Sequence, residues 1–203
     1  MSVKYNEVVK IDKNEALNCS SNCSFKFNYN ENVSFKGKIN PGNVSEGQES
    51  SIYLKPTSSN NDKVVFNGIE LGTPLIISIV RKSHHVYRKD GMIKQADAEL
   101  CIFHKTSNGI FYIICIPINN DDSQSSSVNS LTLKSNRFFN QITSNLYQSN
   151  VNFTDIKTNN ISINDVVPRG EFFYYNLNDT SKKFNIIVYH MDNGITLDKN
   201  SFN

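Results

Sequence analysis

Two apolar segments joined by a short polar turn constrain the fold of this chain more than any other feature. Ala98–His104 and Ile110–Ile118 are rich in the β-branched and aromatic residues typical of strands. The turn between them contains Ser107-Asn108-Gly109, and Asn-Gly is a strong signal for a hairpin. We therefore expect two buried antiparallel strands in the middle of the chain.

Short apolar segments separated by turn residues continue this pattern along most of the sequence. Leu75–Arg81 is almost continuously apolar, as expected for a strand that is buried on both faces. The pattern predicts one β-rich domain with a large sheet and few short helices, a mainly β fold of the α+β kind. The other expected strands are Ser24–Tyr29, Asn32–Ile39, Ser51–Leu54, Lys63–Ile69, Phe172–Leu177, Phe184–His190 and Ile195–Leu197.

One amphipathic helix is expected over Ser135–Leu146, with Ser135 as its N-cap. Asn119–Asn129 and Asn150–Asn160 are polar and are interpreted as exposed loops, which could serve as contact points. The expected apolar face of the helix consists of Phe138, Phe139, Ile142 and Leu146.

Length and charge exclude several classes of protein. The 203 residues fit one domain over 1–203, with residues 1–23 as a possible extended arm. The net charge of +2 argues against a nucleic-acid binder. The longest apolar run, Ile110–Ile118, is shorter than the roughly 20 residues of a membrane-spanning helix. Met1–Lys10 is charged and lacks the apolar core of a secretory signal, so we expect a soluble protein without membrane insertion.

The four cysteines fall into two pairs with different surroundings. Cys19 and Cys23 lie close together in a polar stretch, where either a disulfide or two free thiols are expected. Cys101 and Cys115 lie in apolar runs and are predicted to be buried thiols.

The segment Ala98-Glu99-Leu100-Cys101-Ile102-Phe103-His104 resembles the Ala-Glu-Leu-His-x-x-His strand of the α-carbonic anhydrases. Other segments resemble that family in the same order along the chain. The resemblance implies a twisted, largely antiparallel sheet of about ten strands. The further matching segments are Ser83-His84-His85, Asn136–Asn140, Ile163–Pro168, Phe172–Tyr175, Thr180-Ser181, Phe184–His190 and Gly194–Leu197.

The family's reaction needs zinc on three histidines, with a fourth position left for water. Two of the histidines form a His-x-His pair on one strand, and the resemblance places that pair at Ile79 and Arg81. The third position is Cys101. Because isoleucine and arginine cannot bind zinc, we expect no metal, no cofactor and no enzymatic activity.

Other residues of the family's site persist in part. The resemblance implies that Glu99, His104 and Thr180 remain from the surroundings of the zinc ligands, with Glu99 and His104 now hydrogen-bonded inside the sheet. His84 replaces the family's glutamate. Arg81 is expected either to pair with Glu99 or to reach solvent, because a buried guanidinium needs a partner.

The remaining histidines and cysteine could form a metal site of a different composition or could have structural roles. Cys101 and His104 are an odd number of residues apart on a strand, so they are expected to face opposite sides. The sequence therefore favours structural or solvated histidines over a rebuilt site. The candidates were His84, His85, Cys101, His104 and His190.

The densest basic stretch allows two interpretations. It could bind an anionic glycan or phosphate, or it could be a solvated hairpin loop whose charge Asp90 and Asp97 balance. The sequence favours the solvated loop. The stretch also includes Lys94, and its possible anion-binding residues are Arg81, Lys82, His84, His85, Arg88 and Lys89.

The chain is rich in asparagine, and Asn, Lys, Ile, Tyr and Phe all have AT-rich codons. This usage and the resemblance together suggest a function. Non-catalytic relatives of this family include surface proteins of large DNA viruses. We expect a structural protein, a minor capsid or virion component that docks onto a larger protein shell, located in the virion or otherwise soluble in the cytoplasm. Attachment to a host-surface glycosaminoglycan is the alternative, and an active zinc hydratase is the third possibility.

Overall fold

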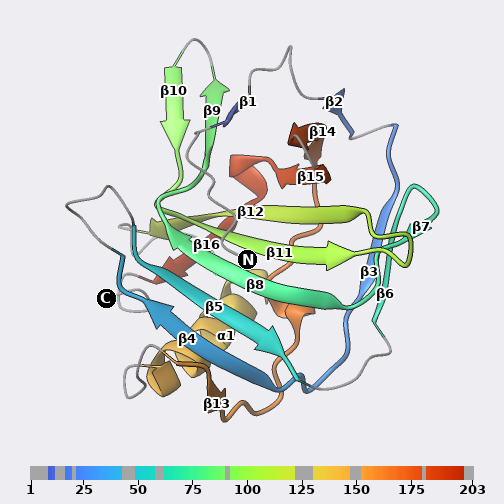
Figure 1. Ribbon diagram of the computed structural model, residues 1–203. Coiled ribbons are helices and arrows are strands. Elements are labelled where there is room, and N and C mark those ends of the chain that lie inside the picture. The colour runs from blue at the N-terminus through green and yellow to red at the C-terminus, as the bar shows by residue number, and fades with distance from the viewer. Residues whose placement is uncertain are drawn as a thin grey trace.

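A ten-stranded sheet runs through the molecule in this computed structural model (Figure 1). The structure describes residues 9–11, 17–19, 22–42, 49–57, 62–89, 92–121, 130–146, 152–179 and 182–198. In spatial order the strands are β13 (Thr154–Ile156), β4 (Phe35–Asn40), β5 (Ser51–Pro56), β8 (Pro74–Arg81), β11 (Ala98–Lys105), β12 (Phe111–Asp121), β15 (Lys182–Tyr189), β14 (Phe172–Asp179) and β2 (Leu17–Asn18), with β16 (Ile195–Asp198) paired to β12.

Two small sheets and a helix complete the described fold. The strands β9 and β10 project from the large sheet as a hairpin, and β1 runs beside β9 (Figure 1). A second small sheet, in the order β3-β6-β7, lies near the start of β8 (Figure 1). The elements are β1 (Val9–Ile11), β9 (His85–Lys89), β10 (Met92–Gln95), β3 (Phe25–Asn28), β6 (Lys63–Phe66), β7 (Ile69–Glu70), the helix α1 (Ser130–Leu146) and the 3-10 turns η2 (Ile163–Asp165) and η3 (Met191–Asn193).

The predicted central hairpin is confirmed. Strands β11 and β12 are antiparallel, with Leu100 opposite Ile116 and Cys101 opposite Cys115. The sheet is mixed, because β12 runs parallel to both β15 and β16. The expectation of a large, largely antiparallel sheet with few helices therefore holds, with parallel pairing at β12.

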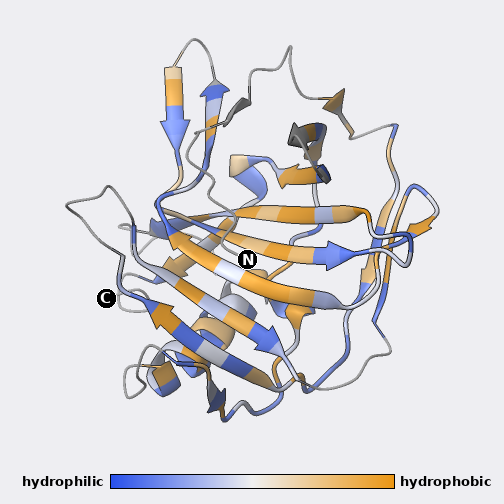
Figure 2. Cartoon of the chain, in the orientation of Figure 1, coloured by the Kyte–Doolittle hydropathy of each residue, from blue (hydrophilic) through white to orange (hydrophobic). Residues whose placement is uncertain are grey.

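Apolar side chains cover both faces of the large sheet, and the central strands are accordingly apolar along their length (Figure 2). Because side chains alternate along a strand, Leu100 and Ile102 point to one face and Cys101 points to the other. The first face packs against α1 through Phe138 and Phe139. We call the other the Cys101 face.

Helix α1 begins at Ser130, so the prediction that Ser135 caps it is wrong. Ser135 lies inside the helix, fully buried, and its Oγ donates a hydrogen bond to the Asp165 carbonyl at 3.0 Å. A long-range partner thus explains this serine better than a local cap. The predicted apolar face is confirmed, because Phe138, Phe139, Ile142 and Leu146 are buried. No helix in the described ranges, α1 included, is long and apolar enough to cross a membrane.

Three segments differ from their predicted conformation. His85–Lys89 and Met92–Gln95 form strands in a stretch interpreted as a loop, because its basic residues mask the alternation of buried His85 and Tyr87. Thr154–Ile156 pairs with β4 inside a segment expected to be irregular. The first residues of the expected loop 119–129 continue β12. Residues 122–129 of that loop lie outside the described ranges, and so do most of residues 1–23.

Replacing Phe139 with alanine should lower the free energy of unfolding by about 3–5 kcal/mol, because it opens a cavity under α1. Leu133→Ala on the same helix is the matched control, since the Leu133 side chain is 62% exposed. The control should change stability by less than about 0.5 kcal/mol. Urea unfolding measures both variants, and equal losses would contradict the packing of α1.

Candidate functional site

The Cys101 face carries the polar side chains that the sheet buries near its centre. Directly opposite residues of an antiparallel pair share a face. Cys101 lies opposite Ser78 on β8 and opposite Cys115 on β12, while Glu99 lies opposite Val80. These five residues therefore project to the same side of the sheet.

The register overturns the predicted set of ligand positions. Ile79 lies opposite Leu100, and Arg81 lies opposite Ala98, so both point to the α1 side and away from Cys101. There they line a cavity of ≈ 260 Å³ together with residues that include Leu146. A shift of one residue along a strand moves every side chain to the other face.

The pair with His-x-His spacing that faces Cys101 and Glu99 is Ser78 and Val80. Neither side chain is an imidazole, and valine has no donor atom. The residues of this face therefore do not fit a zinc ion held by three histidines.

All four histidines of the sequence lie in described ranges, and no three of them approach a common point. His104 lies on the α1 side of the sheet, where its ring contacts the Tyr29 hydroxyl at 3.0 Å and the Gly72 carbonyl at 2.9 Å. Burial lowers the pKa of His104 to about 4, so its ring is neutral. His190 lies beside η3, where its Nδ1 accepts a hydrogen bond from a backbone amide.

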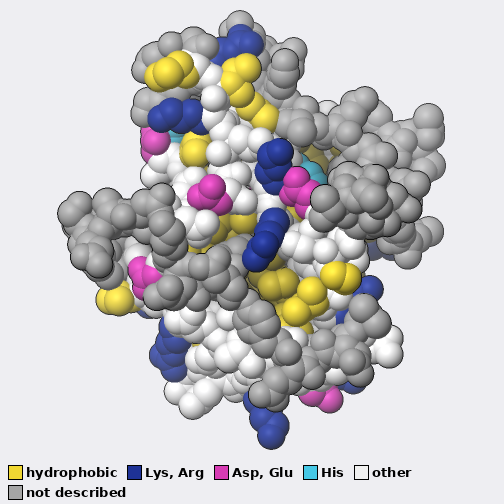
Figure 3. Space-filling model, turned by 90° about the vertical axis from the view of Figure 1, so that its left-hand side faces the viewer, with side chains coloured by type: hydrophobic (Ala, Val, Ile, Leu, Met, Phe, Trp, Pro, Cys, Tyr) yellow, Lys and Arg dark blue, Asp and Glu magenta, His cyan; other side chains and the backbone are white. Residues whose placement is uncertain are grey.

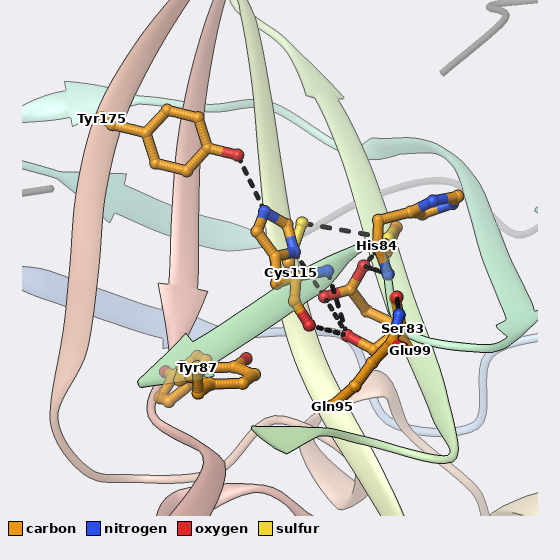
Figure 4. A network of polar contacts seen from close by, with 10 residues as sticks. Ser83, His84, Tyr87, Gln95, Glu99, Cys115 and Tyr175 are labelled. Carbon is orange, nitrogen blue, oxygen red and sulfur yellow. Dashed lines mark hydrogen bonds and ion pairs between the residues drawn. The ribbon is translucent and has the colours of Figure 1, made fainter. Parts of the chain in front are cut away.

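A buried hydrogen-bond network surrounds Glu99 (Figure 4). Its Oε1 accepts hydrogen bonds from His85 Nδ1 at 2.5 Å and from Ser83 Oγ at 3.3 Å. Its Oε2 accepts from the backbone amide of His84 at 3.2 Å. The remaining ring nitrogen of His85 lies 2.7 Å from the Tyr175 hydroxyl. The network thus joins β9, β11 and β14.

The carboxyl group of Glu99 is fully buried and yet ionised. Burial acts to raise its pKa, but the charge and the hydrogen bond of His85, together with His84, outweigh burial and hold the pKa below the usual value. His85 Nδ1 and Glu99 Oε1 form a buried pair, which is an ion pair when His85 is protonated.

Two thiols lie beside this pair. Cys101 Sγ is 3.8 Å from Cys115 Sγ and 3.7 Å from Glu99 Oε2. The hydrogen bond with Cys115 lowers the pKa of Cys101, but burial and the Glu99 charge outweigh it and raise the pKa overall. Burial also raises the pKa of Cys115 well above its usual value. Both cysteines are thus protonated thiols, and their predicted burial is confirmed. In the N-terminal pair, a disulfide joins Cys19 and Cys23.

The other predicted site residues do not form one site. Glu99 and His104 are both buried and hydrogen-bonded, as expected, but they lie on opposite faces of the sheet. Of the two alternatives expected for Arg81, the structure shows the second, because Arg81 is exposed and reaches solvent, while Glu99 pairs with His85. Thr180 lies outside the described ranges.

The six basic residues named above lie in different surroundings. His85 is buried in the network and cannot belong to a surface patch. Arg81, Lys82 and Arg88 are exposed. The structure does not describe the side chain of Lys89. On the face shown in Figure 3, the coloured basic side chains are interspersed with acidic and hydrophobic ones.

Sequence reasoning missed Cys115 and Tyr175 as members of this site. A signal for Cys115 was present, because a hairpin centred near Asn108 places it opposite Cys101. Tyr175 had no local signal, since it comes from β14, and β15 lies between that strand and β12.

Comparisons with known proteins identify the fold. No family model matches the sequence, and no curated protein matches it. Among solved structures, the α-carbonic anhydrase of Thermovibrio ammonificans, in complex with sulfanilamide, matches with a TM-score of 0.65 and 12% identity over 95% of this chain and 74% of that one. Dioscorin in complex with ascorbate gives 0.62 and 13%, covering 95% and 71%.

A hyperthermostable carbonic anhydrase from a hydrothermal vent chimney gives a TM-score of 0.58 and 17% identity, covering 88% of this chain and 68% of that one. The chain thus has the α-carbonic anhydrase fold. Because the sequence identities are low, the likeness is limited to the fold.

Removing one partner of the buried ion pair should strongly destabilise the protein. His85→Phe leaves the Glu99 carboxylate buried without the partner of its Oε1, which should cost about 3–5 kcal/mol of unfolding free energy. His190→Gln, at a half-buried histidine outside the network, is the control and should cost less than about 1 kcal/mol. Urea unfolding at pH 7 measures both, and a His85→Phe loss no larger than that of the control would contradict the ion pair.

The same pair predicts a pH dependence. Because the pKa of Glu99 is lower in the folded state than in the unfolded one, its contribution is present above the usual glutamate pKa of about 4.3 and is lost as pH falls through the folded value. Glu99→Gln should therefore flatten the loss of stability in acid. Unfolding curves collected between neutral and acidic pH measure this, and parallel pH profiles for the two proteins would contradict it.

Proposed function

We propose that this chain is a non-catalytic protein of the α-carbonic anhydrase fold that acts as a structural component by docking onto other proteins. The observation that carries the proposal is the composition of the Cys101 face, where Ser78 and Val80 are the pair that faces Cys101 and Glu99. A fold can persist while the chemistry of its site changes, because function resides in particular side chains.

Loss of the hydratase reaction follows from the donor atoms. A zinc-dependent hydration of this kind requires three protein ligands that retain the metal and one open position where bound water ionises near pH 7. Of the three positions, Val80 offers no donor and Ser78 offers only a neutral hydroxyl. Cys101 alone does not retain zinc in an open three-ligand site.

The surroundings of these positions also disfavour a hydroxide ion. Apolar side chains dominate the same face of the sheet, including Phe103 on β11, Ile113 on β12 and Ile186 on β15. A charged nucleophile among such side chains lacks hydrogen-bond partners and pays a desolvation penalty.

The β9–β10 hairpin supports a docking role. It projects from the large sheet (Figure 1), and Met92 and Ile93 near its tip are 61% and 57% exposed. Among the described strands, β10 pairs only with β9, so its outer edge can accept a strand of another protein. We propose that the partner is a larger protein shell, as in a virion.

Sedimentation of the native protein from its source tests the docking role. Movement with a large particle, identified by mass spectrometry as one dominated by a shell protein, supports the proposal. Migration as a free monomer would contradict it. Retention on heparin that collapses with added salt would instead favour the glycosaminoglycan alternative.

A histidine graft tests which residues occupy the metal positions. The triple variant S78H/V80H/C101H places three imidazoles on one face and should bind one zinc ion per chain. The control I79H/R81H/C101H has the same composition of new side chains but splits them between two faces. It should retain less zinc, because only its Cys101→His substitution places an imidazole on the face of Glu99. Zinc content after dialysis measures both, and equal zinc in the two variants would contradict the register.

A further inference from the structure

We propose that Cys101, Cys115, Glu99 and His85 bind one thiophilic divalent metal ion of the zinc type. This would be a buried structural site. Of the three positions Ser78, Val80 and Cys101, which correspond to the zinc ligands of the family, it includes only Cys101. The inference rests on the network itself and does not depend on the docking role.

Three of the four donor atoms already lie close together. His85, Glu99 and Cys115 each offer one atom, and these atoms all lie within 4.8 Å of one another. Cys101 adds a second sulfur, 3.8 Å from Cys115 Sγ. Zinc–sulfur bonds of about 2.3 Å in a tetrahedron separate two sulfurs by roughly 3.8 Å, so the two thiols already have the spacing of sulfurs that share one ion.

Paired strands hold the donors in place. Cys101 and Glu99 lie on β11, Cys115 lies opposite Cys101 on β12, and His85 lies on β9. All four side chains are at least 95% buried. Figure 4 shows Cys115 and Glu99 converging on the same space between the strands. A rigid cluster of this kind pays little conformational entropy when an ion binds.

The hydrogen bonds around the cluster suit a bound ion. Binding removes the two thiol protons and the proton between His85 Nδ1 and Glu99 Oε1, and these protons pass to solvent as the metal–ligand bonds form. The other ring nitrogen of His85 then donates to the Tyr175 hydroxyl at its present distance of 2.7 Å. Ligating histidines usually have such a partner, which fixes the orientation of the ring.

The donor set determines the class of ion and the role. Two thiolates with an imidazole select zinc over magnesium or calcium, which prefer oxygen ligands. Four protein donors fill a tetrahedron and leave no position for a reactive water. The ion would therefore stabilise the sheet at the junction of β9, β11 and β12.

Cobalt(II) titration of the full-length protein, kept reduced, tests the site. We expect one equivalent to bind, with the visible bands of tetrahedral cobalt and a thiolate-to-metal charge-transfer band, both removed by zinc. The double variant C101S/C115S removes both sulfurs and should abolish the charge-transfer band. The double variant C19S/C23S is the matched control and should retain it, because that cysteine pair lies outside the cluster.

Tyr175→Phe should weaken zinc binding by about 10–100-fold and keep the tetrahedral spectrum, because it removes only the partner that orients His85. Bound zinc should also raise the melting temperature of the wild type. The absence of a charge-transfer band in the folded, reduced wild type would overturn the proposal, and this result does not depend on whether C101S/C115S folds. Retention of the full band in C101S/C115S, in which neither proposed sulfur remains, would overturn it as well.

Discussion

A single buried carboxylate constrains the packing around the middle of the large sheet. Glu99 has no contact with solvent, and an unpaired charge at that depth would cost several kcal/mol. His85 bonds to it through Nδ1, and His85 comes from β9, which is not part of the large sheet. The orientation of β9 against β11 and the position of Tyr175 on β14 both follow from the need to satisfy this one group.

The alternation of side chains along a strand decides what chemistry the fold can perform. Residues 78 and 80 share the face of Cys101, whereas residues 79 and 81 pack toward α1. The same backbone could therefore hold a metal with one set of side chains and fill a hydrophobic core with the next. In this chain the face that would serve catalysis carries a serine, a valine and two protonated thiols beside an ion pair.

Much of the sheet was predictable because its signals are local. The β11–β12 hairpin followed from two apolar runs and an Asn-Gly turn, and the apolar face of α1 followed from helical spacing. The register of β8 was not predictable in the same way. Leu75–Arg81 is apolar on both faces, so no period of two shows which residues point toward Cys101. The sequence match therefore slipped by one residue.

Long-range contacts account for the other differences. Ser135 looked like a helix cap, but its hydroxyl is bonded to the Asp165 carbonyl, 30 residues away in the chain. His85 looked like a member of a basic surface, and its partner Glu99 lies 14 residues away on another strand. Tyr175 is 90 residues from His85 and had no motif to mark it.

The most direct test of this account is the rate of CO₂ hydration by the purified protein after incubation with zinc, compared with buffer containing the same zinc. The account predicts equal rates, because the three positions that share the face of Cys101 cannot hold an ion with an open position for water. A zinc-dependent acceleration that a chelator removes would contradict it and would show that the hydratase chemistry survives on this sheet.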